Sequence, residues 1–258
     1  MTTLLLGQDK FNLWDADALS ESEFEHTVAQ ALTAIYPDYN CFIFTGGFRF
    51  DDKVFKPDLA LVAKDYSHWF VIEVELTSHS FERHVVPQIR AFQYGNPEED
   101  CVSILSKRLG HTTQQILTFL RYVPRNVAVI ANKHNSEWEL ALRHLSVQFL
   151  SISAFHSAAG TKAIQMHGHL QVLKEHLGFG KFSATDRAIY FTQYIRLPEG
   201  EIQMIDEDGA AGLWIVKKEE KQMWVRKDIG VPSFPDGVTI QIIRTIDGRI
   251  SILPSKTG

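Results

Sequence analysis

The sequence has few cysteines, no long apolar run and no excess of basic residues. Its 258 residues include only Cys41 and Cys101, too few for a disulfide framework or a cysteine metal cluster. No apolar stretch approaches the ~20 residues that a membrane helix needs. The beginning, MTTLLLGQDK, lacks the basic and apolar regions of a signal peptide. We therefore expect a cytoplasmic protein with no membrane partner.

The charge balance argues against a protein that coats nucleic acid without specificity, because such proteins are normally basic. The formal net charge is −5, whereas residues 180–258 hold 11 basic and 11 acidic residues, so the excess of acids lies in the first part. An acidic domain can still bind nucleic acid where its acids hold a metal ion.

Three common catalytic signatures are missing from the sequence. It has no phosphate-binding Walker loop, no Gly-x-Gly-x-x-Gly motif and no Gly-x-Ser-x-Gly nucleophile elbow. The chemistry must therefore be sought in other side chains, and the acids of the first part are the most informative.

The first part alternates between helical and strand periodicity. Ser20 and Glu23 have capping-box spacing ahead of an apolar helical stripe, Gly46-Gly47 indicates a bend in a strand, and Ser136 is the expected N-cap of a later helix. The expected elements are a helix at 21–35, three strands of an antiparallel meander at 41–50, 56–63 and 68–76, a helix at 80–95 interrupted by Pro87, helices at 99–108 and 112–122, a strand at 126–131, a helix at 136–145 and a strand at 147–153.

The last part has a strand-and-turn pattern only. From residue 186 onward, six strand-like segments are separated by short turns, which predicts a small β-barrel or sandwich. Residues 157–184 are expected to be a connector with one or two short elements. The predicted domains are thus 1–156 and 185–258, joined by that connector.

One predicted strand carries an unusual pair of charges. In FVIEVEL, residues 70–76, Glu73 and Glu75 share a face. Two acids side by side in a strand repel each other, and burial adds to the cost. Asp58 precedes them on the neighbouring predicted strand, so the three carboxylates can converge on a hard divalent cation such as Mg²⁺.

The ordered motifs resemble the PD-(D/E)xK nuclease superfamily, which has the restriction-endonuclease-like fold. The resemblance covers about residues 20–153 and rests on KPD at 56–58, IEVE at 72–75, EFEHTVAQAL at 23–32 and QIRAFQY at 88–94. It implies an α/β fold with a mixed sheet flanked by helices, and Mg²⁺ or Mn²⁺ held by Asp58 and Glu73.

Further residues take roles by the same resemblance. Glu25 shares a helical stripe with Val28 and Leu32, so it is expected to face the sheet as an additional acid; an exposed acid at a helix start is the alternative. Gln88 is expected to position water or substrate. His84, Arg90 and Tyr94, on the same helix, are expected to contact substrate, with a merely solvated face as the alternative.

Glu75 departs from the superfamily pattern, which has lysine at this position. A glutamate is expected to act as a further metal ligand or as a general base, unless catalysis has been lost. Lys56, two residues before Asp58, is expected to share its strand face and to supply the missing positive charge. His79 and His84 are five residues apart with no third ligand nearby in the sequence, so zinc is not expected.

The sequence therefore predicts a metal-dependent nuclease that hydrolyses phosphodiester bonds, with DNA as the favoured substrate. The alternative is a catalytically inactive nuclease-fold module that binds nucleic acid or protein. The C-terminal β-domain is expected to supply specificity, substrate grip or contact with a partner, which includes a second copy of the chain. Two tryptophans in it, Trp214 and Trp224, lie among basic residues, namely Lys217, Lys218, Lys221, Arg226 and Lys227. They form either a stacking surface for single strands or part of the barrel core.

Overall fold

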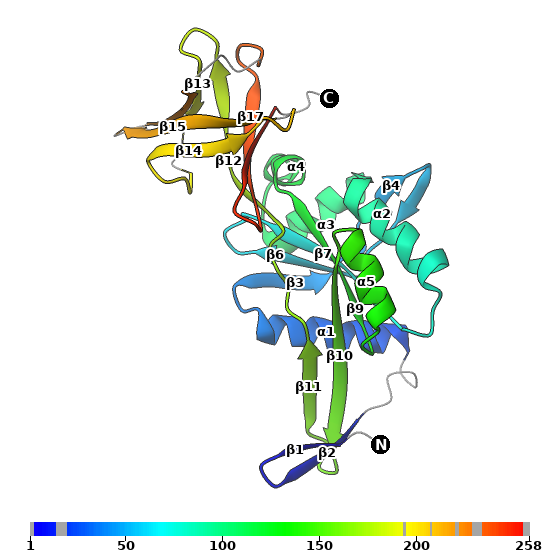
Figure 1. The fold of residues 1–258 in the computed structure, drawn as a ribbon. Coiled ribbons are helices and arrows are strands. Elements are labelled where there is room, and N and C mark those ends of the chain that lie inside the picture. Colours follow the sequence, from blue (N-terminus) through cyan, green and yellow to red (C-terminus); the bar gives the residue numbers. More distant parts are fainter. Residues whose placement is uncertain are drawn as a thin grey trace. The chain divides into compact units, whose positions relative to one another are not determined.

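A computed structural model describes residues 3–13, 20–192, 195–206, 208–219, 222–228 and 234–254 (Figure 1). The chain forms two compact units. The first unit comprises Met1–Leu117 and Arg125–Gln171, and the second comprises Thr118–Pro124 and Val172–Gly258. The first is a mixed α/β unit and the second is a closed β-barrel.

The first unit is built on an eight-stranded mixed sheet. The strand order is β1-β2-β10-β9-β7-β6-β3, with β11 also paired to β10. The pairs β7–β9 and β9–β10 are parallel, and the other pairs are antiparallel. The strands are β1 (Thr3–Leu6), β2 (Asp9–Leu13), β3 (Tyr39–Ile43), β6 (Leu59–Ala63), β7 (Trp69–Glu75), β9 (Arg125–Ala131), β10 (Gln148–Ser157) and β11 (Lys162–His167).

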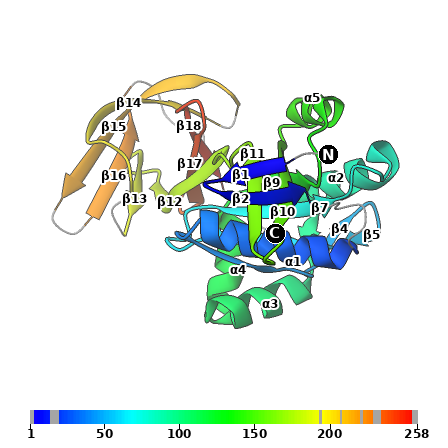
Figure 2. The same ribbon diagram turned by 90° about the horizontal axis from the view of Figure 1, so that it is seen from below.

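Helices flank this sheet on both faces. The helix α1 packs against β3 and β7, α2 against β7 and β9, and α5 against β10. Figure 2 shows α5 on one side of the sheet and α3 on the other. The helices are α1 (Glu21–Ile35), α2 (Val86–Tyr94), α3 (Glu99–Leu109), α4 (Thr113–Tyr122) and α5 (Ser136–His144), and a π-helical turn at Phe81–Val85 leads into α2.

A second, three-stranded sheet interrupts the meander between β3 and β6. It has the order β5-β4-β8, formed by β4 (Phe48–Phe50), β5 (Lys53–Phe55) and β8 (Asn96–Pro97). The expected bend at Gly46 has a steric reason, since a Cβ there would lie 2.7 Å from the Phe44 ring and 2.8 Å from Cys101 Sγ. A larger residue would therefore displace the core.

The central strands are the most deeply buried. Every residue of β6 and β7 is buried, including two acids of β7. An aromatic cluster of Phe44, Phe48, Trp69 and Phe92 packs edge to face beside them. Burial on both faces is typical of strands that helices cover on each side, and it places the end of β7 in a low-dielectric environment.

The second unit is a closed barrel with strand order β12-β13-β16-β15-β14-β18-β17. Its interior is filled by apolar side chains such as Trp214, Met223, Ile240 and Ile252. The strands are β12 (Lys174–Ser183), β13 (Ala188–Phe191), β14 (Gly200–Ile205), β15 (Ala211–Glu219), β16 (Gln222–Lys227), β17 (Thr239–Thr245) and β18 (Ile250–Pro254). Closure removes the free edges that a sandwich would leave.

The predicted α/β class with helices on both faces and an all-β C-terminal part is confirmed, and the all-β part is a barrel and not a sandwich. Residues 157–184, expected to be a connector, contain β11 and the barrel strand β12. Gly178 and Gly180 hid the strand: a Cβ at Gly178 would lie 2.2 Å from Ile195 Cγ2, and the register shifts between His176 and Gly178. Glycine inside a strand is typical of such close approaches and bulges.

The helix α5 begins one residue earlier in its cap than the sequence predicts. The N-cap of α5 is Asn135, whose side chain accepts from the backbone N–H groups of Glu137 and Trp138, both at 3.1 Å, so the prediction of Ser136 is wrong. Both residue types cap helices well, and the one with extended backbone takes the role.

Among the described residues, no helix combines the length and apolarity needed to cross a membrane.

Candidate metal centre

Five acids from three elements of the first unit influence one another. Glu21 and Glu25 lie in the first turns of α1, Asp58 lies directly before β6, and Glu73 and Glu75 lie in β7. Repulsion from these neighbours contributes to a raised pKa for both Asp58 and Glu73. Such a concentration of acids in a buried setting is costly unless protons or cations compensate it.

Asp58 lies beside the strand that carries Glu73. Its backbone N–H donates to the Ile72 carbonyl at 3.2 Å, directly before the Leu59–Ile72 pair at which the β6–β7 ladder begins. Asp58 Oδ2 also accepts a hydrogen bond from the backbone N–H of Val74 at 2.7 Å. The strand pairing thus fixes the position of the Asp58 carboxylate.

Burial is the main cause of the altered acidity at this position. It raises the pKa of Asp58 to about 7, against the lowering effect of the Val74 N–H. Part of this rise comes from the nearby charges of Glu25, Glu21 and Glu75. Burial and then Asp58 raise the pKa of Glu73 well above its ordinary value. A divalent cation would relieve both effects, since it stabilises the ionised carboxylates.

Gln88 holds the Glu73 carboxylate from α2. Glu73 is 3% exposed, and its Oε1 accepts a hydrogen bond from Gln88 Nε2. The other oxygen, Glu73 Oε2, and the amide oxygen Gln88 Oε1 are both buried without a hydrogen-bond partner among the described residues. Buried polar atoms normally have partners, so these two oxygens are suited to a ligand such as a cation or its water.

Glu75 has a different set of contacts. It is fully buried, and its Oε1 accepts from the backbone N–H of Leu76 at 3.0 Å and contacts His79 Nδ1. His84 Nε2 lies 3.3 Å from Glu75 Oε2. Glu73 therefore faces the Gln88 amide, whereas Glu75 faces two imidazoles.

The other predicted acid and the predicted lysine, Glu25 and Lys56, lie in different environments. Glu25 is half-buried, and its pKa is raised by burial and by Glu21, so it belongs to the acidic group. Glu23 is instead the capping partner of Ser20, as expected. Lys56 is exposed in the link between β5 and β6, so the premise that it shares a strand face with Asp58 is wrong. Its ammonium role stays a prediction.

The residues predicted to contact substrate, one in the π-helical turn and two on α2, do not share one face. His84 contacts Glu75, whereas Arg90 is exposed and Tyr94 is 68% exposed. At about 100° per residue, Arg90 lies ~200° and Tyr94 ~240° around the helix from Gln88. Binding of substrate by Arg90 and Tyr94 stays a prediction, and it would use a surface away from the Gln88 amide.

Sequence reasoning missed Glu21 and set His79 aside. Among the described residues, one group of at least three acids and histidines has its ligand atoms within 4.8 Å of one another: Glu21, Glu75, His79 and His84. The expectation that His79 and His84 have no third ligand nearby is thus wrong. The four-residue spacing of Glu21 and Glu25, which puts both on one helix face, was the available signal.

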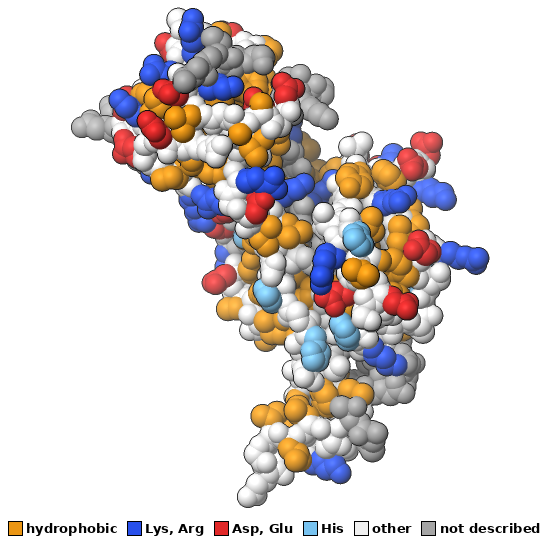
Figure 3. Space-filling model, viewed as in Figure 1, with side chains coloured by type: hydrophobic (Ala, Val, Ile, Leu, Met, Phe, Trp, Pro, Cys, Tyr) orange, Lys and Arg blue, Asp and Glu red, His pale blue; other side chains and the backbone are white. Residues whose placement is uncertain are grey.

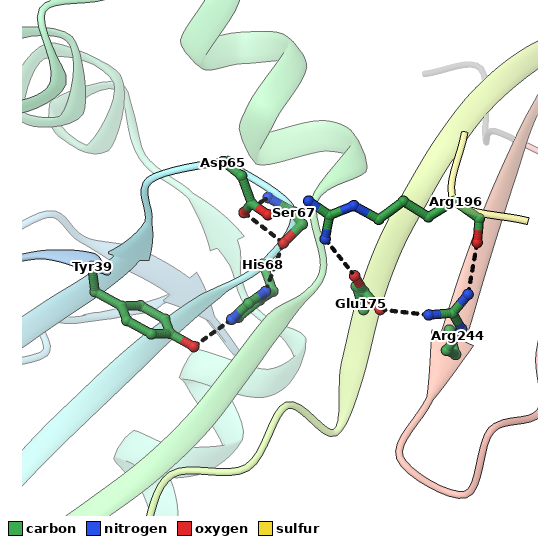
Figure 4. A network of polar contacts seen from close by, with 7 residues as sticks. All are labelled: Tyr39, Asp65, Ser67, His68, Glu175, Arg196 and Arg244. Atoms are coloured by element: carbon green, nitrogen blue, oxygen red, sulfur yellow. Dashed lines mark hydrogen bonds and ion pairs between the residues drawn. The ribbon is translucent and has the colours of Figure 1, made fainter. Parts of the chain in front are cut away.

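Other polar groups stabilise each unit separately, as Figure 4 shows. In the first unit, Tyr39 OH lies 2.7 Å from His68 Nε2, and Ser67 Oγ links His68 Nδ1 (2.8 Å) to Asp65 (2.7 Å). This network fixes the β6–β7 turn, at the opposite end of these strands from Asp58 and Glu75. In the second unit, Glu175 pairs with Arg196 at 3.5 Å and Arg244 at 3.4 Å.

The tryptophans of the barrel have different environments. Trp214 is 1% exposed in the core and is unavailable for stacking. Trp224 is flanked by Lys217 and Arg226, each 5.6 Å from its ring centroid. Lys221 lies outside the described residues. On the face shown in Figure 3, basic and acidic side chains are interspersed, which agrees with the charge balance of the sequence. Only Trp224 therefore remains a candidate for stacking with a base.

Comparison with known proteins gives no relative from which a role can be transferred. No protein-family model matches the sequence, and no curated protein matches it at a significant level.

Proposed function

We propose that the chain is a divalent-metal-dependent nuclease with a restriction-endonuclease-like core, acting on phosphodiester bonds and preferentially on DNA. The observation that carries this proposal is the Asp58 carboxylate bound to the Val74 N–H at 2.7 Å, next in the chain to the buried Glu73, whose Oε2 oxygen has no described partner. The element order supports it: an acid-bearing helix precedes three antiparallel strands that bring two acids together.

Asp58 and Glu73 would hold Mg²⁺ or Mn²⁺, both of which favour oxygen ligands. When bound, such an ion polarises a phosphoryl oxygen, acidifies water and offsets developing charge. Gln88 donates to Glu73 and so orients that carboxylate, while its own amide oxygen, which has no hydrogen-bond partner among the described residues, can accept a hydrogen bond from water or a hydroxyl. Glu25 adds negative charge that strengthens cation binding. Glu75 lies on the same strand face as Glu73 and adds a further buried carboxylate to the acidic group.

A second candidate is a nuclease-fold module without catalysis. The superfamily has lysine two residues after the acid that corresponds to Glu73. This chain has Glu75 there, and its carboxylate contacts two imidazoles. Lys56, the other candidate for a positive charge, is exposed outside the strand. This candidate predicts that the protein binds nucleic acid or a protein partner without cleaving DNA or RNA under any divalent-metal condition.

Cleavage assays with the full chain separate the two candidates. Single- and double-stranded DNA and RNA are incubated with the protein in Mg²⁺, in Mn²⁺ and in chelator. We expect metal-dependent cleavage that Asp58→Asn and Glu73→Gln each abolish. The control is Glu82→Gln, an exposed acid in the π-helical turn, which should cleave normally. Undiminished cleavage by Asp58→Asn and Glu73→Gln would overturn the assignment, and inactivity of the unaltered protein on all four substrates would favour the second candidate.

A further inference from the structure

A second group of potential ligands lies beside the Asp58–Glu73 pair. Glu21 is the first residue of α1, Glu75 is the last of β7, His79 follows in the next turn, and His84 lies in the π-helical turn. Their donor atoms all lie within 4.8 Å of one another. Two carboxylates and two imidazoles thus converge from segments that are separated by more than fifty residues in the sequence.

Glu75 provides an independent indication that this group has a ligand. Its side chain is fully buried, and within the described part of the chain Oε2 has no hydrogen-bond partner, although it lies 3.3 Å from His84 Nε2. A buried carboxylate oxygen left in this state is costly. A cation between the carboxylate and the imidazoles would compensate this cost and would take both histidines in their neutral, ligating form.

His84, which contacts Glu75, lies in the π-helical turn. The N–H of Val86 donates to the carbonyl of Phe81, five residues earlier, so this turn holds one residue more than an α-helical turn. The His79 and His84 rings lie 5.4 Å apart at an interplanar angle of 76°. Single π-helical turns occur frequently at functional sites, and this one carries one of the two converging histidines.

The two histidines also leave a path for an ion to enter. The side chain of His79 is 38% exposed and that of His84 is 50% exposed, whereas Glu75 lies behind them at 0%. The group is therefore deep on one side and open to solvent on the other. This arrangement suits a bound ion that exchanges with solution.

We propose that Glu21, Glu75, His79 and His84 form a transition-metal site of the zinc type, distinct in donor chemistry from the Asp58–Glu73 pair. Imidazole nitrogen is a ligand for Zn²⁺ and its first-row neighbours, whereas Mg²⁺ selects oxygen ligands and keeps most of its waters. Four protein donors match the tetrahedral coordination of Zn²⁺. The site explains why Glu75 stands where the superfamily has lysine, because its carboxylate would bind the same ion as the two histidines. It does not depend on nuclease activity.

Metal titration of the chelator-stripped full chain tests the site without any activity assay. We measure Zn²⁺ binding by calorimetry and use Co²⁺ as an optical probe, because four-coordinate Co²⁺ absorbs strongly in the visible region. We expect about one Zn²⁺ per chain and a Co²⁺ absorption band that excess Mg²⁺ leaves intact. Displacement of Co²⁺ by Mg²⁺ would overturn the proposal, since it would indicate an all-oxygen site.

Variants identify the ligands. We expect His79→Gln and His84→Gln each to weaken Zn²⁺ binding at least about tenfold, since even residues behind metal ligands are worth 10–100-fold in affinity. The matched control is His144→Gln, an exposed histidine at the end of α5, which should bind Zn²⁺ normally. Equal Zn²⁺ binding by the unaltered protein and both variants would mean adventitious binding and would reject the site. Because His84 is half exposed, His84→Gln keeps the test valid even if His79→Gln fails to fold.

One further variant separates this proposal from the proposed function. Asp58→Asn is expected to lose cleavage while it retains the Co²⁺ absorption band. Loss of the band in Asp58→Asn together with its retention in both histidine variants would place the ion at the Asp58–Glu73 pair and overturn the second site. Failure of cleavage in the unaltered protein with a normal Co²⁺ band would reject the nuclease and keep the metal site.

Discussion

The Gln88 amide donates to one oxygen of the buried Glu73 carboxylate, while the other oxygen of that carboxylate is left without a described partner. The Glu73 carboxylate is thus held on one side by the protein, while its other oxygen is buried without a described partner. A residue that fixes a ligand in this way has a measurable role in both stability and cation binding.

Replacing this amide with an acid should make stability depend on metal. We expect Gln88→Glu to lower the free energy of unfolding by about 1–3 kcal/mol without metal, because a buried carboxylate loses its donor and gains a like charge. Mn²⁺ should restore part of the loss in urea unfolding. The matched variant Gln93→Glu, also on α2, removes a hydrogen bond to the Leu145 carbonyl but should not respond to Mn²⁺. An equal response of both variants would contradict the role of Gln88.

The raised pKa of Asp58 predicts a stability that falls as pH rises. The pKa is about 7 in the fold and 3.8 ordinarily, so the stability linked to Asp58 is complete below pH 3.8 and is lost as pH rises through 7. At about 1.4 kcal/mol per pKa unit, the loss amounts to as much as ~4 kcal/mol.

We therefore expect Asp58→Asn to be more stable than the unaltered protein at pH 8 in chelator, with the difference shrinking at pH 5. The charges that face this position are Glu21 and Glu25 on α1 and Glu73 and Glu75 on β7. Urea unfolding at both pH values measures the effect. Parallel pH profiles for the two proteins would show that Asp58 titrates normally.

His176 predicts the opposite pH dependence in the barrel. Burial lowers its pKa from 6.5 to about 4, so the linked stability is present above pH 6.5 and is lost as pH falls through 4. The loss is about 3 kcal/mol. The ring stacks near Phe179 at 6.1 Å, and its Nδ1 lies 3.3 Å from Gln241 Nε2. NMR titration of the His176 ring should give a midpoint near pH 4, and a midpoint near pH 6.5 would contradict its burial.

Loss of the first cap should destabilise the helix that carries Glu21. Ser20 accepts from the Glu23 backbone N–H at 3.3 Å, and the Glu23 carboxylate accepts from the Ser20 N–H at 3.0 Å. We expect Ser20→Ala to lower the free energy of unfolding by about 1 kcal/mol. Ser22→Ala, an exposed change two residues further along in the first turn of the same helix, is the control and should have less effect in thermal unfolding. Equal effects of the two substitutions would argue against the capping box.

The sequence was sufficient where the signals were local. The capping box at Ser20 and Glu23, the alternation along FVIEVEL and the interruption at Pro87 each predicted an element that the structure contains. These patterns concern residues within one turn or one strand, whose geometry is fixed by backbone periodicity.

The sequence was insufficient where distant segments meet. The group of Glu21, Glu75, His79 and His84 depends on the docking of α1 against β7 and on a π-helical turn, and neither has a reliable pattern in the sequence. The barrel strand β12 was hidden because Gly178 and Gly180 are required by close contacts, with Ile195 at Gly178 and with the Tyr190 carbonyl at Gly180. Tertiary contacts override local propensity in such places.

The strand pairing of β10 imposes an order on synthesis of the chain. Leu13, Asn12 and Phe11 of β2 pair with Phe155, His156 and Ser157, near the end of β10. The hairpin of β1 and β2 is translated before β10 and cannot pair with it until β10 has been made. Leu5 and Leu6, which are exposed even in the completed fold, therefore lie in a segment whose partner strand is distant in the sequence and is synthesised later.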